Sequence, residues 1–411
     1  MYTSPLSSFV VNDKLSNRHA ALNLIRFNPG EISRVEIARR IGLTRAAVSS
    51  IIGDLINMGI IREAERITSA NGRPPVVLEI NPEYGRVVGI DIGASHISLL
   101  LADMGASIID ECDSSFDIGK GPESGLKVLD QLLHEMLGKH NIPINRILAA
   151  GIGVPGPISV DAGAVISPPI MPNWDGFPIR DSLEKLWEIP VSLNNDAELG
   201  ALGEWAAGAG RGERDLAYIK VGTGIGAGLI LDGEIYRGVT GSAGEIGHLT
   251  IDEDGPLCTC GNRGCLEAFA GGRAIAQQAQ DAVSNKKRTH LSTIQPIESI
   301  TALDVATAAQ QGDLFSQQIL ERAGTQIGIA IAGLVNFLNP GMVIIGGGVA
   351  QTGDIILEPM RQAVQRRSLP AATRTVRITT AMLGKRSSSI GAVTQAISIA
   401  LKQVAARKEV R

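Results

Sequence analysis

Aromatic side chains are scarce in this 411-residue sequence and make up 3% of it. Proteins that bind single-stranded nucleic acid without sequence preference stack its bases on aromatic rings, so this composition argues against such a surface. There are only four cysteines, and three of them fall between Cys258 and Cys265. That clustering excludes a disulfide framework spread over the fold and favours metal binding in a reducing compartment.

Signal-peptide and membrane-span patterns are also missing. The first ten residues, MYTSPLSSFV, lack the basic region and the apolar core of a signal peptide. The most apolar stretch, residues 327–349, is interrupted by Asn336, Asn339 and Pro340. We expect a buried helix, a turn and a buried strand there rather than a bilayer span. The sequence therefore predicts a cytoplasmic protein with no membrane partner.

Charge is divided unevenly along the chain. Residues 1–75 hold ten Lys/Arg and six Asp/Glu, whereas the whole chain has a net charge of −4. A basic N-terminal piece on an acidic body indicates an anionic partner for that piece. Glycine is abundant, with 48 residues, against an average share of about 7%. The glycines gather at a few turns, which favours loops that lie close against a ligand.

The N-terminal segment follows the order of a helix-turn-helix. Apolar spacing predicts a helix over residues 17–27, and Ser33 can cap a second, short helix. The buried side of that second helix would carry Val35, Ile37, Ala38 and Ile41. After a tight turn at Gly42, Thr44 can cap a third helix that runs to about Met58. In this order of elements the last helix enters the major groove of double-stranded DNA.

A hairpin follows the three helices. Strand-like residues 59–63 and 76–80 flank an Asn71-Gly72 turn, which would place Arg73 at the tip of a wing, near DNA phosphates or the minor groove. The alternative is three helices and a hairpin that pack together and bind no ligand. The order of these elements, with small polar residues on the third helix and a basic hairpin tip, favours DNA binding. The predicted DNA contacts are Thr44, Arg45, Ala46, Ser49, Ser50 and Arg73.

The rest of the chain contains an internal duplication. The stretches that begin at Val87 and Ala217 each run through a buried strand, a Gly-rich turn, a second strand, a tight turn and a third strand. Duplicated lobes of this kind bind a ligand in the cleft between them. Gly-rich turns expose backbone amides that can cradle phosphate, although either turn alone is better explained as a tight hairpin.

The three clustered cysteines follow a Cys-x-Cys-x4-Cys pattern, and His248 lies ten residues upstream of the first. A Cys3His set is a closed tetrahedral arrangement that structural Zn²⁺ prefers. A free-thiol cluster or a disulfide between neighbours is the alternative. The predicted metal ligands are His248, Cys258, Cys260 and Cys265.

From Val87 to its end the chain resembles the ROK family of sugar kinases and repressors, most specifically at residues 244–248 (Gly-Glu-Ile-Gly-His) and 258–267. The N-terminal segment is similar to the winged domain of ROK repressors, including their Gly-Arg-Pro-Pro wing. The resemblance implies an α/β protein, with a winged helix-turn-helix followed by a two-lobed actin-like ATPase (ROK sugar kinase) fold. The implied divisions are a winged domain over 1–81, a first lobe over 82–195 completed by a C-terminal helix over 388–405, and a second lobe with the zinc site over 196–387.

The same resemblance implies which residues bind ligands. The sugar contacts would be Asn173, Asn195, Asp196, Glu245, His248 and Glu267. In a kinase Asp196 would also be the general base for the attacking hydroxyl. The ATP contacts would be Gly93, Gly222, Thr223, Gly224 and Gly347.

The first phosphate loop departs from the kinase pattern. Active ROK kinases usually have Asp-x-Gly-Gly-Thr there, whereas this chain has Asp91-Ile92-Gly93-Ala94-Ser95, followed by His96. The methyl group of Ala94 stands where backbone should approach phosphate, which argues against use of ATP and Mg²⁺.

We therefore expect a repressor of carbohydrate uptake or catabolism genes, a homodimer or homotetramer whose operator affinity changes when a monosaccharide binds the cleft. An ATP-dependent sugar kinase is the enzyme alternative, because the second phosphate loop is intact. A third interpretation is a repressor controlled by a sugar-transport protein. The Asn195-Asp196 pair and the Glu245-x-x-His248 motif favour free sugar over that third interpretation.

Overall fold

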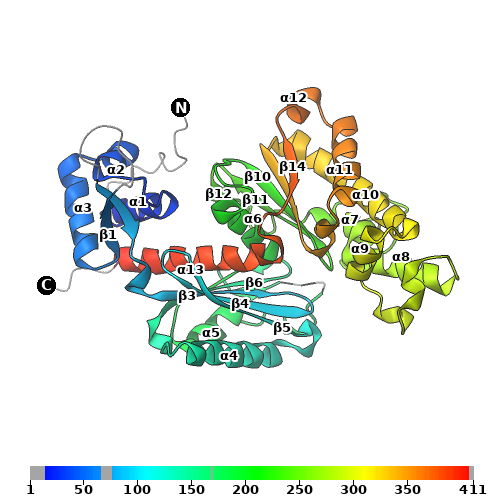
Figure 1. The fold of residues 1–411 in the computed structure, drawn as a ribbon, viewed down its shortest axis with the longest axis horizontal. Coiled ribbons are helices and arrows are strands. Elements are labelled where there is room, and N and C mark those ends of the chain that lie inside the picture. Colours follow the sequence, from blue (N-terminus) through cyan, green and yellow to red (C-terminus); the bar gives the residue numbers. More distant parts are fainter. Residues whose placement is uncertain (1–13, 66–75, 167, 169, 407–411) are drawn as a thin grey trace.

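The computed structural model describes residues 14–65, 76–166, 168 and 170–406. A small N-terminal domain lies at one end of the molecule, and two α/β lobes make up the rest (Figure 1). None of the helices in the described part of the chain is long and apolar enough to span a membrane.

The N-terminal domain is a winged helix-turn-helix. Its elements are α1 (Lys14–Phe27), α2 (Arg34–Ile41), α3 (Arg45–Asn57), β1 (Ile61–Glu65) and β2 (Val76–Ile80), and the two strands pair antiparallel. Ser33 and Thr44 cap α2 and α3 as expected, because their hydroxyls accept hydrogen bonds from the amides of Glu36 and Ala47. Gly42 ends α2 in the left-handed conformation, with a φ of 71°. The predicted helices and hairpin are thus confirmed, while Arg73 and the predicted Asn71-Gly72 turn lie outside the described residues.

One residue of α2 faces the opposite way from the prediction. Ile37, Ala38 and Ile41 are buried, but Val35 is 54% exposed. Val35 is two residues from Ile37, which places it about 200° around the helix from that core position. The sequence prediction for Val35 was therefore wrong.

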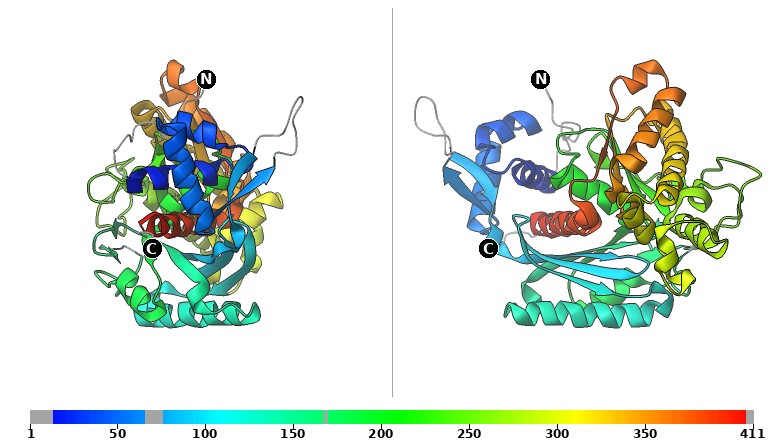
Figure 2. Two further views of the ribbon diagram at one scale, coloured as in Figure 1. Left: turned by 90° about the vertical axis from the view of Figure 1, so that its left-hand side faces the viewer. Right: turned by 45° about the vertical axis from the view of Figure 1, so that its right-hand side comes forward.

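The first lobe is built on a five-stranded sheet in the order β5-β4-β3-β6-β9, with α13 on one face and α4 on the other (Figure 2). The lobe contains β3 (Arg86–Ile92), β4 (His96–Asp103), β5 (Ile108–Ser115), α4 (Pro122–Lys139), β6 (Ile147–Val154), β7 (Ile158–Ser159), β8 (Ala164–Val165), α5 (Ile179–Trp187) and β9 (Val191–Asn195). The first three strands are antiparallel, and β3, β6 and β9 run parallel.

The second lobe repeats this plan in a sheet ordered β12-β11-β10-β13-β14. It contains α6 (Asp196–Ala207), β10 (Leu216–Val221), β11 (Ile225–Leu231), β12 (Glu234–Ile235), α7 (Leu266–Ala270), α8 (Gly272–Ser284), α9 (Ala302–Gln310), α10 (Leu314–Leu338), β13 (Met342–Gly346), α11 (Asp354–Arg367), α12 (Pro370–Thr373) and β14 (Arg377–Thr380). Its strands have the same sequence of antiparallel and parallel pairings as those of the first sheet. The predicted duplication is confirmed.

The last helix, α13 (Ser387–Ala406), joins all three parts of the molecule (Figure 1). It crosses α6 so closely that a Cβ on Gly391 would lie 1.8 Å from the carbonyl oxygen of Leu199. Its other end shares one hydrophobic core with the winged domain, and buried Leu22 and Leu401 belong to that core. Arg26 of α1 donates a 2.5 Å hydrogen bond to the carbonyl of Thr394. The winged domain is therefore packed on the body through α13.

Candidate functional site

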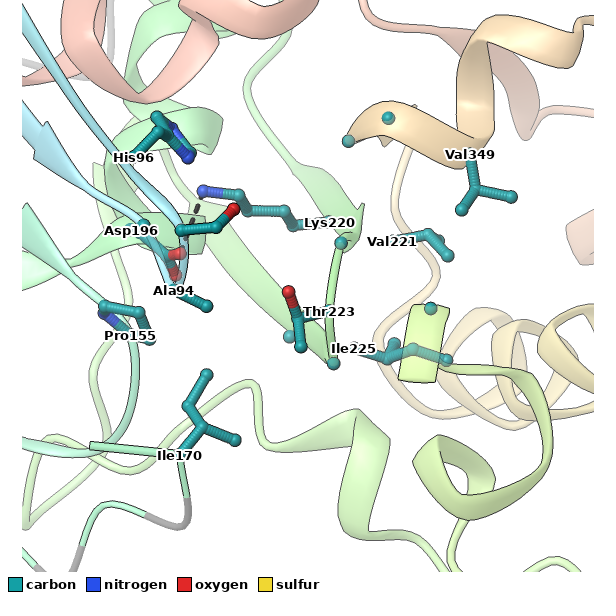
Figure 3. A pocket seen from close by; sticks show the side chains of 18 of the residues that line it. Ala94, His96, Pro155, Ile170, Asp196, Lys220, Val221, Thr223, Ile225 and Val349 are labelled. Carbon is teal, nitrogen blue, oxygen red and sulfur yellow. Dashed lines mark hydrogen bonds and ion pairs between the residues drawn. The ribbon is translucent and has the colours of Figure 1, made fainter. Parts of the chain in front are cut away.

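A cleft of about 880 Å³ lies between the two lobes. Side chains of the first lobe, including Ala94 and His96, line one side of it, and Thr223 and Ile225 of the second lobe line the other (Figure 3). The cleft is large enough for a small-molecule ligand.

A carboxylate–lysine cluster, formed by Asp91, Asp196 and Lys220, lies at the base of this cleft. Asp91 is near the end of β3, Asp196 is the first residue of α6, and Lys220 is near the end of β10. The Lys220 Nζ lies 2.8 Å from Oδ2 of Asp196 and 3.6 Å from Oδ2 of Asp91. The same ammonium donates to Oγ of Ser388 at 3.2 Å. Lys220 thus links the second lobe to the first lobe and to the start of α13.

Burial and charge set the protonation of this cluster. Burial works against the charged form of Lys220, but the carboxylates of Asp196 and Asp91 outweigh it and raise the pKa of Lys220. Burial also opposes ionisation of Asp91, but Lys220 and His96 outweigh it and lower the pKa of Asp91. For Asp196 burial prevails and raises the pKa of the carboxyl, although the ion pair with Lys220 counteracts it. The ammonium of Lys220 is therefore held charged inside the cleft.

The first Gly-rich turn, between β3 and β4, is covered by a side chain. A Cβ on Gly93 would lie 2.2 Å from a carbon of the His96 imidazole, so that ring lies directly against the turn. His96 Nε2 is 3.7 Å from Oδ2 of Asp91. Ala94 lines the cleft beside it. This turn is therefore less accessible to phosphate than a glycine turn alone would be.

The second Gly-rich turn, residues 222–226, lines the cleft, and Glu267 lies against it, because a Cβ on Gly224 would be 2.1 Å from its Oε2. Thr223 is exposed at the tip of the turn, and Gly222 has open space where a Cβ would stand. Gly347 has a φ of 91° and lies against the carbonyl of Val221, so only glycine fits there comfortably. Gly222, Thr223, Gly224 and Gly347 all line the cleft, as does Gly93.

Five of the six predicted sugar contacts line this cleft: Asn195, Asp196, Glu245, His248 and Glu267. Asn195 caps α6, and its amide nitrogen donates to the carbonyl of Gly156 at 3.0 Å. Glu267 accepts a 2.9 Å hydrogen bond from the amide of Ile225, and burial raises the pKa of Glu245. The structure therefore brings these side chains together although up to 72 residues separate them in the sequence.

The sixth predicted contact, Asn173, is exposed and is not among the residues that line the cleft. Its neighbour Trp174 is completely buried and donates a 2.9 Å hydrogen bond to the carbonyl of Ile118. A role for Asn173 in sugar binding stays a prediction.

The four predicted metal ligands converge beside the cleft. The ligand atoms of His248, Cys258, Cys260 and Cys265 lie within 4.8 Å of one another. The Sγ atoms of Cys260 and Cys265 are 3.7 Å apart, and Sγ of Cys258 is 3.6 Å from Nδ1 of His248. Zn–S bonds of about 2.3 Å in a tetrahedron imply sulfur separations near 3.8 Å. This cysteine cluster can hold a metal ion, and its donor set suits Zn²⁺.

The recognition surface predicted on α3 is exposed. Its described members, Thr44, Arg45, Ala46, Ser49 and Ser50, are all exposed, while Val48, Ile51, Ile52 and Leu55 on the other face are buried. The face is polar and available to an external partner.

Sequence reasoning missed Lys220 as a functional residue. The only signal was a lysine within a strand whose other positions, Leu216 to Val221, are buried apolar residues. A lysine in such a strand needs a partner, but the partners are 24 and 129 residues away in sequence.

Two sequence families match this chain. The model of the ROK family matches residues 87–398, and that of a winged helix-turn-helix DNA-binding domain matches residues 16–62. The xylose repressor of Caldicellulosiruptor bescii is 34% identical over 367 residues, which is 89% of this chain and 92% of that protein.

Solved structures share the fold. A ROK-family transcriptional regulator, a homologue of the Escherichia coli Mlc protein, superposes with a TM-score of 0.81 at 25% identity and covers 95% of this chain and 98% of its own. A ROK-family glucokinase from Streptomyces griseus, solved with glucose and AMPPNP, superposes with a TM-score of 0.66 at 28% identity. It covers 76% of this chain and 99% of its own. The predicted α/β fold class, with its winged N-terminus, is confirmed.

Proposed function

Because this chain belongs to the ROK family and carries a winged helix-turn-helix, we propose that it is a sugar-responsive transcriptional repressor of carbohydrate uptake or catabolism genes. The observation that carries the proposal is the position of α13. Ser388 at its start contacts Lys220 in the cleft, and Thr394 accepts a hydrogen bond from Arg26 of the winged domain. One helix thus connects the ligand cleft with the DNA-binding part.

The effector in this proposal is a monosaccharide. Asn195, Asp196, Glu245, His248 and Glu267 supply the carboxylate, amide and imidazole groups that hold adjacent hydroxyls. Xylose and glucose are the first candidates, since relatives are a xylose repressor and a glucokinase. Sugar changes operator affinity only if it binds two conformations unequally, and closure of the lobes around the cleft offers that difference.

The DNA contacts in this proposal come from α3 and the wing. Thr44, Arg45, Ala46, Ser49 and Ser50 read base edges or phosphates, and Arg73 adds a contact from the wing. We propose domain limits of 1–81 for the winged domain, 82–195 with 388–405 for the first lobe, and 196–387 for the second. A single winged domain reads few base pairs, so a homodimer or homotetramer would bind a palindrome.

Footprinting tests the proposal directly. The purified protein is placed on DNA upstream of its own gene, and D-xylose, D-glucose and N-acetylglucosamine are each added in turn. The expected result is a protected palindrome with half-sites one or two helical turns apart, whose protection changes with one sugar. Absence of any protected palindrome would count against the repressor, and protection indifferent to every sugar would favour control by a transport protein.

We further propose that the cysteine cluster holds structural Zn²⁺. When bound, the ion would have four protein ligands and no open position for catalysis. Its ligands His248 and Cys265 lie close in sequence to Glu245 and Glu267, so the ion would fix both glutamates at the cleft.

A sugar kinase is the second candidate, and the open space beside Gly222 and the exposed Thr223 in the cleft favour it. In that case Asp196 would accept the proton of the attacking hydroxyl. With ATP, Mg²⁺ and the sugar found by footprinting, we expect negligible ADP release, because His96 covers Gly93 and Lys220 pairs with Asp196. Sugar-dependent turnover that vanishes in Asp196→Asn would make the enzyme the primary function.

A further inference from the structure

We propose that Lys220 is a built-in cation that takes the place of a divalent metal ion in the cleft. The proposal rests on the proposed function, since it explains how the cleft binds sugar as a sensor without a metal–nucleotide complex. The ammonium of Lys220 stands between the carboxylates of Asp91 and Asp196, which arrive from different elements, β3 and α6.

The oxygen atoms around the ammonium resemble a site for a hard cation. Two carboxylates and the hydroxyl of Ser388 face Nζ of Lys220, at 2.8, 3.6 and 3.2 Å. Carboxylate and neutral oxygen ligands are the set that Mg²⁺ and Mn²⁺ prefer. Asp91 is 2% exposed, and within the described chain its Oδ1 has no hydrogen-bond partner. Because Oδ1 has no hydrogen-bond donor among the described residues, the charge of Asp91 depends on the cationic groups that face its Oδ2, of which Lys220 is 3.6 Å away and His96 is 3.7 Å away.

The electrostatics require one cation at this position. Asp91 is buried and the side chain of Asp196 is 15% exposed, and two such carboxylates without a cation would repel each other. Lys220 neutralises the two carboxylates. Because its ammonium is covalently part of the chain, it cannot leave the site as a bound metal ion can. The tethered ammonium therefore excludes a divalent ion by occupying its place and by removing most of the negative charge that would attract it.

Two functional consequences follow. Nucleotide phosphates in transfer reactions rely on a metal ion that bridges them and neutralises their charge. With Lys220 in place, the position between Asp91 and Asp196 is closed to a metal ion that phosphates could share. In addition, the Oδ2 of Asp196 already accepts a hydrogen bond from Lys220, which holds this carboxylate as a sugar ligand rather than as a base. Both effects favour sensing over phosphoryl transfer.

Mn²⁺ binding, counted by electron paramagnetic resonance, tests the proposal. Lys220→Met removes the charge and keeps most of the side-chain volume, so this variant should gain one Mn²⁺ per chain relative to the wild type. The gain should disappear in the double variant Lys220→Met/Asp91→Asn. Lys385→Met is the matched control, because Lys385 also lines the cleft but pairs with the solvent-exposed Asp113. This control should gain none.

The opposite results would overturn the proposal. They are a folded Lys220→Met variant that gains no Mn²⁺, or a wild-type protein whose Mn²⁺ binding is lost in Asp91→Asn. If Lys220→Met does not fold, Mn²⁺ binding is measured instead in Lys220→Gln, and the wild type is compared with Asp91→Asn. These two measurements still test the proposal. Neither sugar nor DNA enters these measurements, so failure of the repressor proposal and failure of the built-in cation are observed separately. Zinc content is measured in parallel to show that Mn²⁺ has not replaced the metal of the cysteine cluster.

Discussion

Helix α2 of the winged domain and the interlobe cleft differ in how their charges are paired. In α2, Glu36 pairs with Arg39 and Arg40, three and four residues away, and the side chain of Arg39 is 74% exposed. In the cleft, Lys220 pairs with carboxylates that are far away in sequence, and the side chain of Asp91 is 3% exposed. Exposed pairs contribute little to stability, whereas breaking one partner of a buried pair is costly.

This difference determines how easily the charged side chains of each region can exchange ion-pair partners. The arginine charges of α2 are partly or largely solvated and can be shared with an external polyanion at low cost, whereas Arg18 of α1 is buried and pairs with Asp54. The charged groups of the cleft form ion pairs with one another. A ligand that binds there must therefore replace each ion pair or hydrogen bond that it breaks. Disrupting the cleft side should therefore have larger effects than disrupting the winged side.

The largest effect is expected at the cysteine cluster beside the cleft. Cys265→Ser removes a buried side chain that we propose as a zinc ligand, and because metal binding energy is folding energy, the loss should reach several kcal/mol and lower the Tm by roughly 10 °C or more. Elemental analysis should find one zinc per wild-type chain and much less in the variant. Cys112→Ser, a half-buried cysteine outside the cluster, is the control. Stoichiometric zinc in a variant without Cys258, Cys260 and Cys265 would disprove these ligands.

A smaller effect is expected for Asp196→Asn in the carboxylate–lysine cluster. The amide keeps the shape but loses the charge, so sugar binding should weaken by roughly 1.5–3 kcal/mol, which is about ten- to hundredfold. Operator binding without sugar should stay near normal. Calorimetric titration with the sugar found by footprinting measures the change, and Asp181→Asn, on the exposed side of α5, is the control. Unchanged sugar affinity in a folded Asp196→Asn variant would remove Asp196 from the site.

On the winged side, Arg45→Ala should weaken and relax operator recognition. Arg45 is exposed at the start of α3 and supports no core contact, so its loss should cost about 1–3 kcal/mol in DNA binding and leave the Tm unchanged. Fluorescence anisotropy with the operator and a scrambled duplex measures both affinity and specificity. Arg374→Ala makes the same change of charge on the exposed surface of the second lobe. If the two variants bind DNA equally well, α3 is not the recognition helix.

The same contrast explains what the sequence could predict. The helix caps at Ser33 and Thr44, the strand repeats and the cysteine spacing depend on neighbours within a few residues, and the structure has them as expected. The position of Val35 was predicted wrongly because a short helix gives too few residues to fix its buried face. Lys220 was missed because its role depends on Asp91 and Asp196, which only the packing of two lobes brings near. Local patterns thus predicted the elements and the ligand types, but not the contacts between lobes.

The smallest effect is expected for Glu36→Gln in α2. Hydrogen bonds from Arg39 and Arg40 lower the pKa of Glu36 from an ordinary value of 4.5 to about 2. A carboxyl with a lowered folded-state pKa stabilises the fold above its unfolded pKa, and this contribution is lost as the pH falls through the folded value. Because the pair is solvated, the variant should lose less than about 1 kcal/mol at pH 7. Urea unfolding should show that difference shrink between pH 4.5 and pH 2, whereas Glu31→Gln, an exposed glutamate before α2, controls for loss of charge alone. If the stability lost in Glu36→Gln stays constant with pH, the glutamine acts through packing and the charge of Glu36 does not stabilise α2.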